Sequence, residues 1–555
     1  MNELLYSNIS LATIALAISA AALPKIRRRL RLSRAKHPSL AGHSRMAKRF
    51  ARLIPGYSYD EAGFFGSDLA PADIQRARQR GFVRLATALQ LRSPTSLALS
   101  TEAATYVPDM KFVARYRVPF QYSAYLNQHL RLSSFLTKAE GVMLEDLDGQ
   151  RYFDLAGSYG VNVFGVDFYR SCLDEAAQCA RALGPVLGAY HPVLADNVKR
   201  LAEISGLGSI SFHMSGTEAV MQAVRLARYH TGKTHLVRFC GAYHGWWEDV
   251  QPGIGNPLPP RQTYTLADMS ERSLNVLRTR NDIACVLVNP LQALHPNANA
   301  PGDSSLVDSG RSAKFEREAY SAWLQQLAQV CKERGIVFIL DEVFLGFRLA
   351  RGGAQAYFKV RADMVTYGKT LGGGLPVGVV CGRPELMQRY RDARPADICF
   401  ARGTFNSHPY VMAAMNAFLQ RIDNDAIGQI YEAADTVWNQ RRDQFNLAME
   451  HATLPVRATN LQSIWTLGYT QPSRYNWMLQ FYLREQGLML SWVGTGRLIF
   501  SLSYTDALFA EVLQRFVAAA QQMQADGWWH PSGQTNKLIR RSLLLEMLKR
   551  RRGGS

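Results

Sequence analysis

Short apolar runs alternate with helical segments through the middle of the chain, and this alternation is the strongest constraint on the fold. The runs THLVRFC, ACVLVNP and GIVFILD have the length and apolar content of buried strands. Before the first of them, GTEAVMQAVRLARYHT is typical of a helix, which Gly232 should end. Such an alternation predicts an α/β fold with a mainly parallel sheet covered by helices on both faces. Polar residues that follow the strands should then meet at the carboxyl edge of the sheet.

Further segments surround this α/β body. GVMLEDLDGQRYFDL is typical of two short strands joined by a turn at Asp148 and Gly149. Residues 182–204 have a helical pattern. Residues 71–91 also look helical, and the stretch 106–125 is rich in Tyr and interrupted by Pro. We therefore expect an accessory region before residue 130 that forms a lid or wraps a dimer partner.

The excess positive charge lies at the two ends of the chain. Of the net charge of +19, residues 25–52 contribute +11 without an acid, and residues 537–555 contribute +6 with Glu546 as their one acid. The rest of the chain carries +2, which is ordinary for a globular body. The terminal bases lie beside aliphatic rather than aromatic residues, which argues against nucleic-acid binding.

An apolar stretch at residues 9–23 precedes the first basic block and, extended back to residue 4, has roughly the twenty residues that a bilayer span needs. No base precedes it, which argues against a secretory signal peptide. We expect residues 1–24 to be a membrane anchor or interfacial helix that holds the downstream chain at the cytoplasmic face. The C-terminal KLIRRSLLLEMLKRRR predicts an amphipathic helix, either on the membrane surface or packed on its own domain.

The cysteines and histidines are scattered. None of the seven cysteines forms a CxxC pair, and no His/Cys cluster has the spacing of metal ligands. The sequence therefore predicts no metal site and no disulfide framework, and it indicates a reducing compartment.

Two loops could hold a phosphorylated aromatic ligand. Ser215, Gly216 and Thr217 come directly before a helix, where free N–H groups and the helix dipole favour a phosphate, although the same residues could be a simple N-cap. Tyr243 and His244 follow a strand and lie between two glycines. The Tyr243 ring could cover a planar heterocycle there, or it could merely pack.

Asp341 and Lys369 each follow a predicted buried strand. Asp341 comes after four apolar residues, where a carboxylate is costly unless it is paired. An aspartate facing a pyridine nitrogen would keep that ring protonated, whereas the structural alternative is a helix cap. Lys369 lies just before three glycines that allow close backbone approach. Burial would lower its pKa and make it a nucleophile.

The motifs follow one another in a fixed order: SGTEA, YHG, DEV with G-F-R and D-M-V-x-x-G-K, and then GTFNSHP. In this order and spacing, residues 130–525 resemble the class III aminotransferases, which are pyridoxal-phosphate (PLP) enzymes of fold type I. The glutamate-1-semialdehyde aminomutase branch is the most similar. The resemblance implies a large domain with a mainly parallel seven-stranded sheet, a smaller α+β domain, and a homodimer with shared active sites.

The resemblance also implies a role for each motif residue. Lys369 would attach the cofactor, and Asp341 would pair with its pyridine nitrogen. Tyr243 would stack on the cofactor ring. The other implied contacts are Ser215, Gly216 and Thr217 on the phosphate, Thr404 on the phosphate of the neighbouring subunit, His244 and Val343 on the cofactor, and Ser158 and Tyr159 on the substrate.

Some positions depart from the family pattern. Asn289 stands where the family carries the glutamate of a Glu-Pro pair, Gln292 is retained, and Leu294 replaces a second glutamate. Gly496 stands where aminomutases carry a glutamate, which weakens the interpretation as an aminomutase. Arg497 beside it is a candidate for binding a substrate carboxylate, or for a structural ion pair.

Together these residues predict an aminotransferase that moves an amino group from an amine donor to an aldehyde or ketone. The alternatives are an aminomutase of the glutamate-1-semialdehyde type and a non-catalytic scaffold with this fold. Apolar residues near the site loops, together with the anchor, suggest a lipophilic acceptor, with an acyl carrier protein as a candidate partner. Those apolar residues are Trp246, Trp247, Phe344, Phe347 and Tyr357.

The expected domain order follows from these assignments. After the anchor at 1–24 we expect a basic linker and accessory helices at 25–130, the N-terminal part of the small domain at 131–200, the large PLP-binding domain at 201–410, the C-terminal part of the small domain at 411–530, and a basic amphipathic tail at 531–555.

Overall fold

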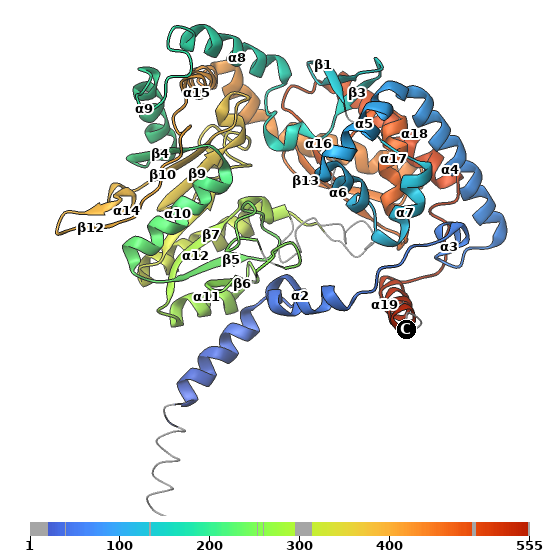
Figure 1. The fold of residues 1–555 in the computed structure, drawn as a ribbon, viewed down its shortest axis with the longest axis horizontal. Coiled ribbons are helices and arrows are strands. Elements are labelled where there is room, and N and C mark those ends of the chain that lie inside the picture. The colour runs from blue at the N-terminus through green and yellow to red at the C-terminus, as the bar shows by residue number, and fades with distance from the viewer. Residues whose placement is uncertain are drawn as a thin grey trace, which may run out of the picture.

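The computed structural model describes residues 20–552, apart from residues 21, 39, 133–134, 252, 259, 295–312 and 491–495. Figure 1 shows two lobes, of which one is built around a large sheet and the other is mainly helical. Most of the predicted anchor at 1–24 lies outside the described residues.

The large lobe contains the seven-stranded sheet that the resemblance implied. β10 runs antiparallel to both of its neighbours, and the pairs from β9 to β6 are all parallel, so the prediction of a mainly parallel sheet is confirmed. In spatial order its strands are β4 (Ser209–His213), β10 (Gly378–Gly382), β9 (Met364–Gly368), β8 (Val337–Asp341), β7 (Ile283–Val288), β5 (His235–Phe239) and β6 (Thr263–Leu266).

Helices cover both faces of this sheet because its strands are apolar on both sides. Cys285 and Leu287 of β7 pack with α10, whereas Val286 and Val288 pack in the cluster that contains α12. α10 ends at Gly232, whose left-handed φ of 65° confirms the predicted helix stop. The helices of this lobe are α8 (Val166–Ala180), α9 (Val193–Ser205), α10 (Gly216–Thr231), α11 (Glu271–Thr279), α12 (Arg317–Arg334), α13 (Gly353–Phe358), α14 (Pro384–Met387) and α15 (Pro409–Arg421), beside the hairpin of β11 (Tyr390–Arg391) and β12 (Arg394–Ile398).

The predicted helix at 182–204 is only partly correct. The helix α9 begins at Val193, and residues 182–192 form turns and coil. Gly184 and Gly188 adopt positive φ angles of 59° and 88°, and Pro192 lies at the N-cap. The apolar spacing was misleading here, because glycines in the left-handed region and the proline prevent a continuous helix.

The second lobe is assembled from two distant parts of the chain. β3 pairs in parallel with β15, more than three hundred residues later, and so joins the early hairpin to the C-terminal part. Gly149, with φ of 77°, lies in the turn between β2 and β3, as predicted. The elements are β1 (Leu136–Glu140), β2 (Met143–Asp146), β3 (Arg151–Asp154), β13 (Val456–Leu461), β14 (Ile464–Tyr469), β15 (Leu488–Met489), β16 (Arg497–Ile499), α16 (Asp425–His451), α17 (Leu479–Glu485), α18 (Asp506–Ala525) and α19 (Asn536–Arg552).

Residues 61–129 form a layer of five helices on this second lobe (Figure 1). We call it the N-terminal layer: α3 (Glu61–Gly66), α4 (Ala72–Arg92), α5 (Pro94–Tyr106), α6 (Pro108–Tyr116) and α7 (Phe120–His129). The helix predicted at 71–91 is therefore confirmed as α4. Phe64 and Tyr122 of this layer share one apolar cluster with Trp477 and Trp528 of the C-terminal part, so the layer is part of the lobe's core.

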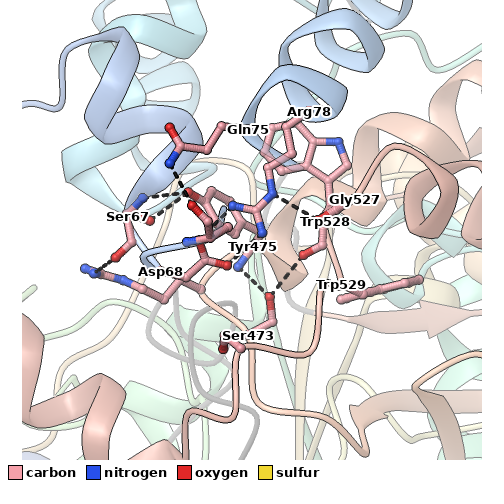
Figure 2. A network of polar contacts seen from close by, with 12 residues as sticks. Ser67, Asp68, Gln75, Arg78, Ser473, Tyr475, Gly527, Trp528 and Trp529 are labelled. Carbon is pink, nitrogen blue, oxygen red and sulfur yellow. Dashed lines mark hydrogen bonds and ion pairs between the residues drawn. The ribbon is translucent and has the colours of Figure 1, made fainter. Parts of the chain in front are cut away.

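A buried polar network also joins the N-terminal layer to the second lobe (Figure 2). Both guanidinium nitrogens of the Arg78 fork lie 2.7 Å from the carboxylate oxygens of Asp68. The Nε of Arg78 donates to the Gly527 carbonyl at 2.9 Å, and the guanidinium lies 4.4 Å from the ring centroid of Tyr475. Arg78 is completely buried, so every one of these contacts is made without solvent.

Candidate active site

The polar segments singled out in the sequence lie at one edge of the large sheet. Asp341 ends β8, Lys369 directly follows β9, and Ser215 follows β4 as the N-cap of α10. Tyr243 and His244 lie in the loop after β5. The carboxyl ends of parallel strands meet at the same edge, which is where α/β folds hold their ligands.

Asp341 is the centre of a buried hydrogen-bond network. Its Oδ2 accepts from the Nδ1 of His244 at 2.7 Å, and its Oδ1 accepts from the backbone N–H of Val343 at 3.1 Å and from the Thr366 hydroxyl at 3.3 Å. Both Asp341 and His244 are 2% exposed. The carboxylate is therefore held in one orientation with an acceptor face toward the sheet edge.

His244 is fixed as the partner of Asp341. Burial lowers the pKa of His244, and the negative charge of Asp341 only partly opposes this, so the imidazole is neutral at neutral pH. A neutral ring that donates from Nδ1 leaves Nε2 as an acceptor. Within the described part of the chain, that buried Nε2 has no hydrogen-bond partner.

Lys369 has the environment of a reactive amine. Burial lowers its pKa, and the nearby charge of Asp341 partly opposes the shift. Its φ of 46° lies in the left-handed region, which a lysine adopts only when the surroundings hold it. The Nζ lies 5.6 Å from the ring centroid of Phe344, so one side of the amine faces an aromatic wall. A larger fraction of neutral amine makes the group a better nucleophile.

The loop before α10 packs tightly against the other segments. The Oγ of Ser215 accepts from the backbone N–H of Glu218 at 3.2 Å, so it caps the helix. A Cβ on Gly216 would lie 2.5 Å from Val343 Cγ1, and one on Gly245 would collide with the Thr217 hydroxyl. These glycines are therefore needed for the loops after β4, β5 and β8 to approach one another.

The loop of Tyr243 is held by two residues that follow β7. Tyr243 is 61% exposed, while its carbonyl accepts from Asn289 Nδ2 at 3.0 Å. Gln292 donates from Nε2 to the Cys240 carbonyl in the same loop. Asn289 and Gln292 thus position the loop that presents Tyr243, a link that could not be predicted from the sequence.

Two buried arginines were missed as site-building residues. Arg238 of β5 donates to the carbonyls of Ala242 and Val250, and so it closes the loop that carries Tyr243. Arg348 donates to the Phe500 carbonyl at 2.8 Å and to the Asn162 carbonyl at 3.0 Å. Burial lowers the pKa of each to about 10. The sequence signal for Arg238 was an arginine within an apolar run, whereas Arg348 is the arginine of the G-F-R motif, to which no role was assigned.

The substrate-side loop of Ser158 and Tyr159 lies close to the amine. Both residues adopt left-handed φ angles, of 46° and 56°. A Cβ on Gly160 would lie 2.6 Å from the ring of Phe344, which is the same ring that faces Lys369. The loop therefore contacts the wall of the site directly.

Thr404 and Arg497 lie in two other segments of the chain. Thr404 is exposed in the turn before α15. Arg497 pairs with Thr466 across the sheet of the second lobe, and Ile499 two residues later packs against Gly157. Phe347 and Tyr357 are not site residues, contrary to the expectation from sequence, because both are buried in the apolar core.

Comparison with known proteins identifies the family. The model of the class III aminotransferases matches residues 124–248 and 317–520, more than half of the chain. The chain belongs to the class III aminotransferase family. The N-terminal layer lies almost entirely before the matched region, and residues 249–316 lie between its two parts.

Curated relatives and solved structures agree with this assignment. A glutamate-1-semialdehyde 2,1-aminomutase of Francisella philomiragia is 32% identical over 308 residues, which cover 52% of this chain and 66% of the relative. The enzyme of the same name from Methanothermobacter thermautotrophicus is 32% identical over 355 residues, 60% of this chain and 77% of the relative.

The fold itself is shared with solved transaminases. A transaminase with PLP bound aligns with a TM-score of 0.63 at 24% identity, over 78% of this chain and 99% of the other. An omega-transaminase from Sphaerobacter thermophilus gives 0.61 at 22% identity, over 78% and 99%. A glutamate-1-semialdehyde aminomutase from Pseudomonas aeruginosa gives 0.63 at 17% identity, over 81% and 99%. The fold is therefore that of the type I PLP enzymes, as predicted.

The site fits the cofactor that class III aminotransferases use, PLP. Asp341 is buried, paired and anchored, as an acid that faces a ring nitrogen must be, and Lys369 lies within electrostatic reach of it. The N-terminus of α10 provides free N–H groups beside Ser215 and Thr217 for a phosphate. Among the described residues, no group of three or more His, Cys, Asp or Glu could hold a metal ion.

Proposed function

We propose that this chain transfers an amino group from an amine donor to a carbonyl acceptor. The observation that carries the proposal is the pairing of a buried, pKa-lowered amine, Lys369, with the anchored carboxylate of Asp341. When bound, PLP supplies the electron sink for the reaction. Asp341 holds a proton at the ring nitrogen, and His244 fixes the direction of its carboxylate.

Lys369 has two tasks in this proposal. Its amine attaches the cofactor, and after the donor amine has replaced it, the same amine is free to take a proton from the substrate carbon and return it. The Phe344 ring and the loop of Ser158 and Tyr159 exclude water on one side of this amine. Arg348, which ties this loop to Phe500, is a positioning residue for the same wall.

Transfer between two separate molecules is favoured over internal transfer within one. The curated relatives of Francisella and Methanothermobacter are named as aminomutases. However, Gly496 stands where the resemblance leads one to expect the glutamate of an aminomutase, and Asn289, at another position that departs from the family pattern, holds the Tyr243 loop. The missing glutamate at position 496 therefore weighs against internal transfer.

One titration distinguishes these functions. Adding an amine donor alone to the PLP-loaded protein should convert the bound cofactor to its amine form, seen by absorbance, and release one equivalent of a separate keto product. Release of the keto product is what identifies an aminotransferase. Conversion without a released product would support the aminomutase, and an absorbance that never responds to any donor would support the scaffold.

We further propose that the enzyme is a homodimer with shared sites. Exposed apolar side chains gather in and beside the segment that carries Thr404, namely Tyr390, Ile398, Phe400 and Phe405. A monomer rarely leaves such a group uncovered. A second copy bound there would bring Thr404 toward the partner's phosphate site. A mass of one chain in light scattering would contradict the homodimer.

We also propose that the protein lies on the cytoplasmic face of a membrane. None of the helices in the described part of the chain is long and apolar enough to cross a bilayer. Three basic helices nevertheless expose apolar side chains: residues 22–35, α2 (Ser44–Leu53) and α19. Figure 1 shows α2 and α19 on one side of the molecule, with the helix at 22–35 extending from that side.

The single acid of α19 explains how this helix can both dock and expose its leucines. Glu546 accepts hydrogen bonds from Arg474 Nη1 at 2.8 Å and from the Tyr59 hydroxyl, so it faces the protein. Leu544 and Leu548, one turn apart, are exposed on another face among the arginines. This arrangement suits an anionic membrane surface.

The full chain should sediment with phosphatidylcholine vesicles that contain phosphatidylglycerol, and much less with pure phosphatidylcholine. Replacing Leu544 and Leu548 together by Asp should weaken binding by at least about tenfold, since each leucine loses its apolar burial. Leu447→Asp, at an exposed leucine of α16, is the matched control. Equal binding by all three proteins would show that α19 does not lie on the membrane.

A further inference from the structure

A large cavity lies between the N-terminal layer and the second lobe. Its volume is about 1110 Å³, slightly above the roughly 300–1,000 Å³ that is usual for ligand pockets. Residues of α5, α6 and α7 form one wall, and Phe481, Met489 and Leu490 belong to the other. Apart from its last helix, the N-terminal layer precedes the region matched by the family model.

The cavity reaches the substrate-side loop of the proposed active site. Ser158 and Tyr159 line it together with the apolar wall of the N-terminal layer. The neighbouring Gly160 packs on Phe344, whose ring faces the amine of Lys369. A ligand in the cavity therefore lies against the same loop as a substrate at Lys369.

The wall of the cavity is mainly apolar. Side chains that line it from the helical layer include Leu97, Ala104, Met110, Val113 and Phe120. An aliphatic chain gains from such a surface in proportion to the apolar area that it buries. The lining therefore suits a flexible hydrocarbon better than a small polar metabolite.

The charged groups of the cavity are mostly basic. Lys111, Arg115, Arg117 and Arg131 line it, against Asp109 and Asp154. The Asp154 carboxylate is already engaged by the backbone N–H groups of Ala156 and Gly157, each at 2.9 Å. A ligand with an acidic group is therefore favoured over a cationic one.

Arg117 is the base most closely associated with the substrate-side loop. The charged or ionisable groups that act on its pKa are Arg484 and the Tyr159 phenol, with no carboxylate among them, and burial lowers that pKa to about 10. Arg117 is half-buried at the cavity wall, so its guanidinium stays accessible to a ligand and would gain from an acidic partner. An anionic ligand group beside Tyr159 would supply the missing charge.

We propose that this cavity binds the carbonyl acceptor as a medium- or long-chain acyl compound with an acidic group. The hydrocarbon lies along α5, α6 and α7, the acidic group lies at Arg117, and the carbonyl is directed past Tyr159 toward Lys369. This inference rests on the proposed function and names its substrate class. Tyr57, which also lines the cavity, lies beside α19, since Arg550 of α19 is 5.9 Å from the Tyr57 ring centroid. The cavity therefore lies next to the proposed membrane face.

Calorimetric titration of the PLP-loaded protein with fatty acids tests the site without turnover. Binding should strengthen from octanoate to dodecanoate by up to about fourfold per methylene, the ratio that corresponds to ~0.8 kcal/mol per buried CH₂. Ala104→Trp fills the cavity and should weaken dodecanoate binding at least tenfold. Ala103→Trp, at the adjacent half-exposed alanine of α5 that does not line the cavity, should leave it within twofold.

Arg117→Gln isolates the polar part of the site. It should weaken dodecanoate but not dodecanol, because only the carboxylate needs the guanidinium. Equal dodecanoate binding by wild type and Ala104→Trp would overturn the proposal, as would an equal loss in both tryptophan variants. The proposal would also be overturned if light scattering gave Ala104→Trp a different mass from the wild type while dodecanoate binding stayed unchanged. In that case the cavity would be occupied by a second copy of the chain.

The donor titration separates this inference from the proposed function. If the donor converts the cofactor in wild type and in Ala104→Trp while fatty acids fail to bind, the aminotransferase stands and the acyl site is wrong. If fatty acids bind as expected but no donor converts the cofactor, the site is a lipid site and the proposed reaction is wrong.

Discussion

Lys369→Ala should reduce the donor half-reaction by about 10²–10⁴-fold or more, the range that a positioned proton-transfer group supplies. The reason is that the same amine both attaches the cofactor and moves the proton, and that burial holds part of it in the neutral form. Stopped-flow absorbance with a saturating amine donor measures the rate. Borohydride should fix the cofactor to the wild-type chain and leave the variant unmodified, as mass spectrometry would show.

Two comparisons make this result specific to Lys369. Lys332→Ala, at an exposed lysine of α12, removes a positive charge far from the sheet edge and should leave the half-reaction unchanged. Methylamine added to Lys369→Ala should restore part of the rate, because it replaces the base and not a structural contact. Full activity in Lys369→Ala, or borohydride fixation at another lysine, would show that the reactive amine lies elsewhere.

The sheet edge could be predicted from the sequence because its determinants are local. Asp341 follows a run of apolar residues, and Lys369 follows a strand and precedes glycines, so each could be placed at a strand end without knowledge of the fold. The order of the motifs then indicated the family. The parallel sheet followed from the alternation of strands and helices.

Contacts between distant segments could not be predicted in this way. His244 and Asp341 are ninety-seven residues apart, and nothing in either segment specifies their hydrogen bond. Arg348 reaches Phe500 across 152 residues. The Phe347 and Tyr357 rings looked like site residues because they follow the Asp341 strand, but the chain turns and buries them in the core.

The N-terminal layer shows the same limit on a larger scale. Helix α4 was predicted from its pattern, but the sequence did not reveal that the layer completes the core of the second lobe and forms one wall of a cavity. The aromatic side chains of the layer, such as Phe64, pack on one another and on Trp477 and Trp528 of the C-terminal part. The acyl site inferred above therefore exists only when the two ends of the chain have docked.

Arg78 is the position where that docking should be most sensitive to mutation. Arg78→Met should lower the free energy of unfolding by about 3–5 kcal/mol, because it leaves the buried carboxylate of Asp68 without a counter-charge and the Gly527 and Phe65 carbonyls without their donor. Urea unfolding followed by tryptophan fluorescence is a suitable measurement, since Trp528 lies beside the network in Figure 2.

The double variant Arg78→Met with Asp68→Leu tests whether the cost comes from the unpaired charge or from lost packing. Replacing both partners by apolar residues removes the uncompensated carboxylate, so the double variant should regain most of the lost stability. Arg76→Met is the surface control on the same helix. If the losses of stability in Arg78→Met and in Asp68→Leu alone simply add in the double variant, the ion pair does not join the layer to the lobe. The aromatic cluster of Phe64 and Trp528 then holds them together instead.

Fatty-acid affinity measured on the same variants should fall with Arg78→Met and recover with the double variant, because the cavity wall is correctly placed only when the layer is docked.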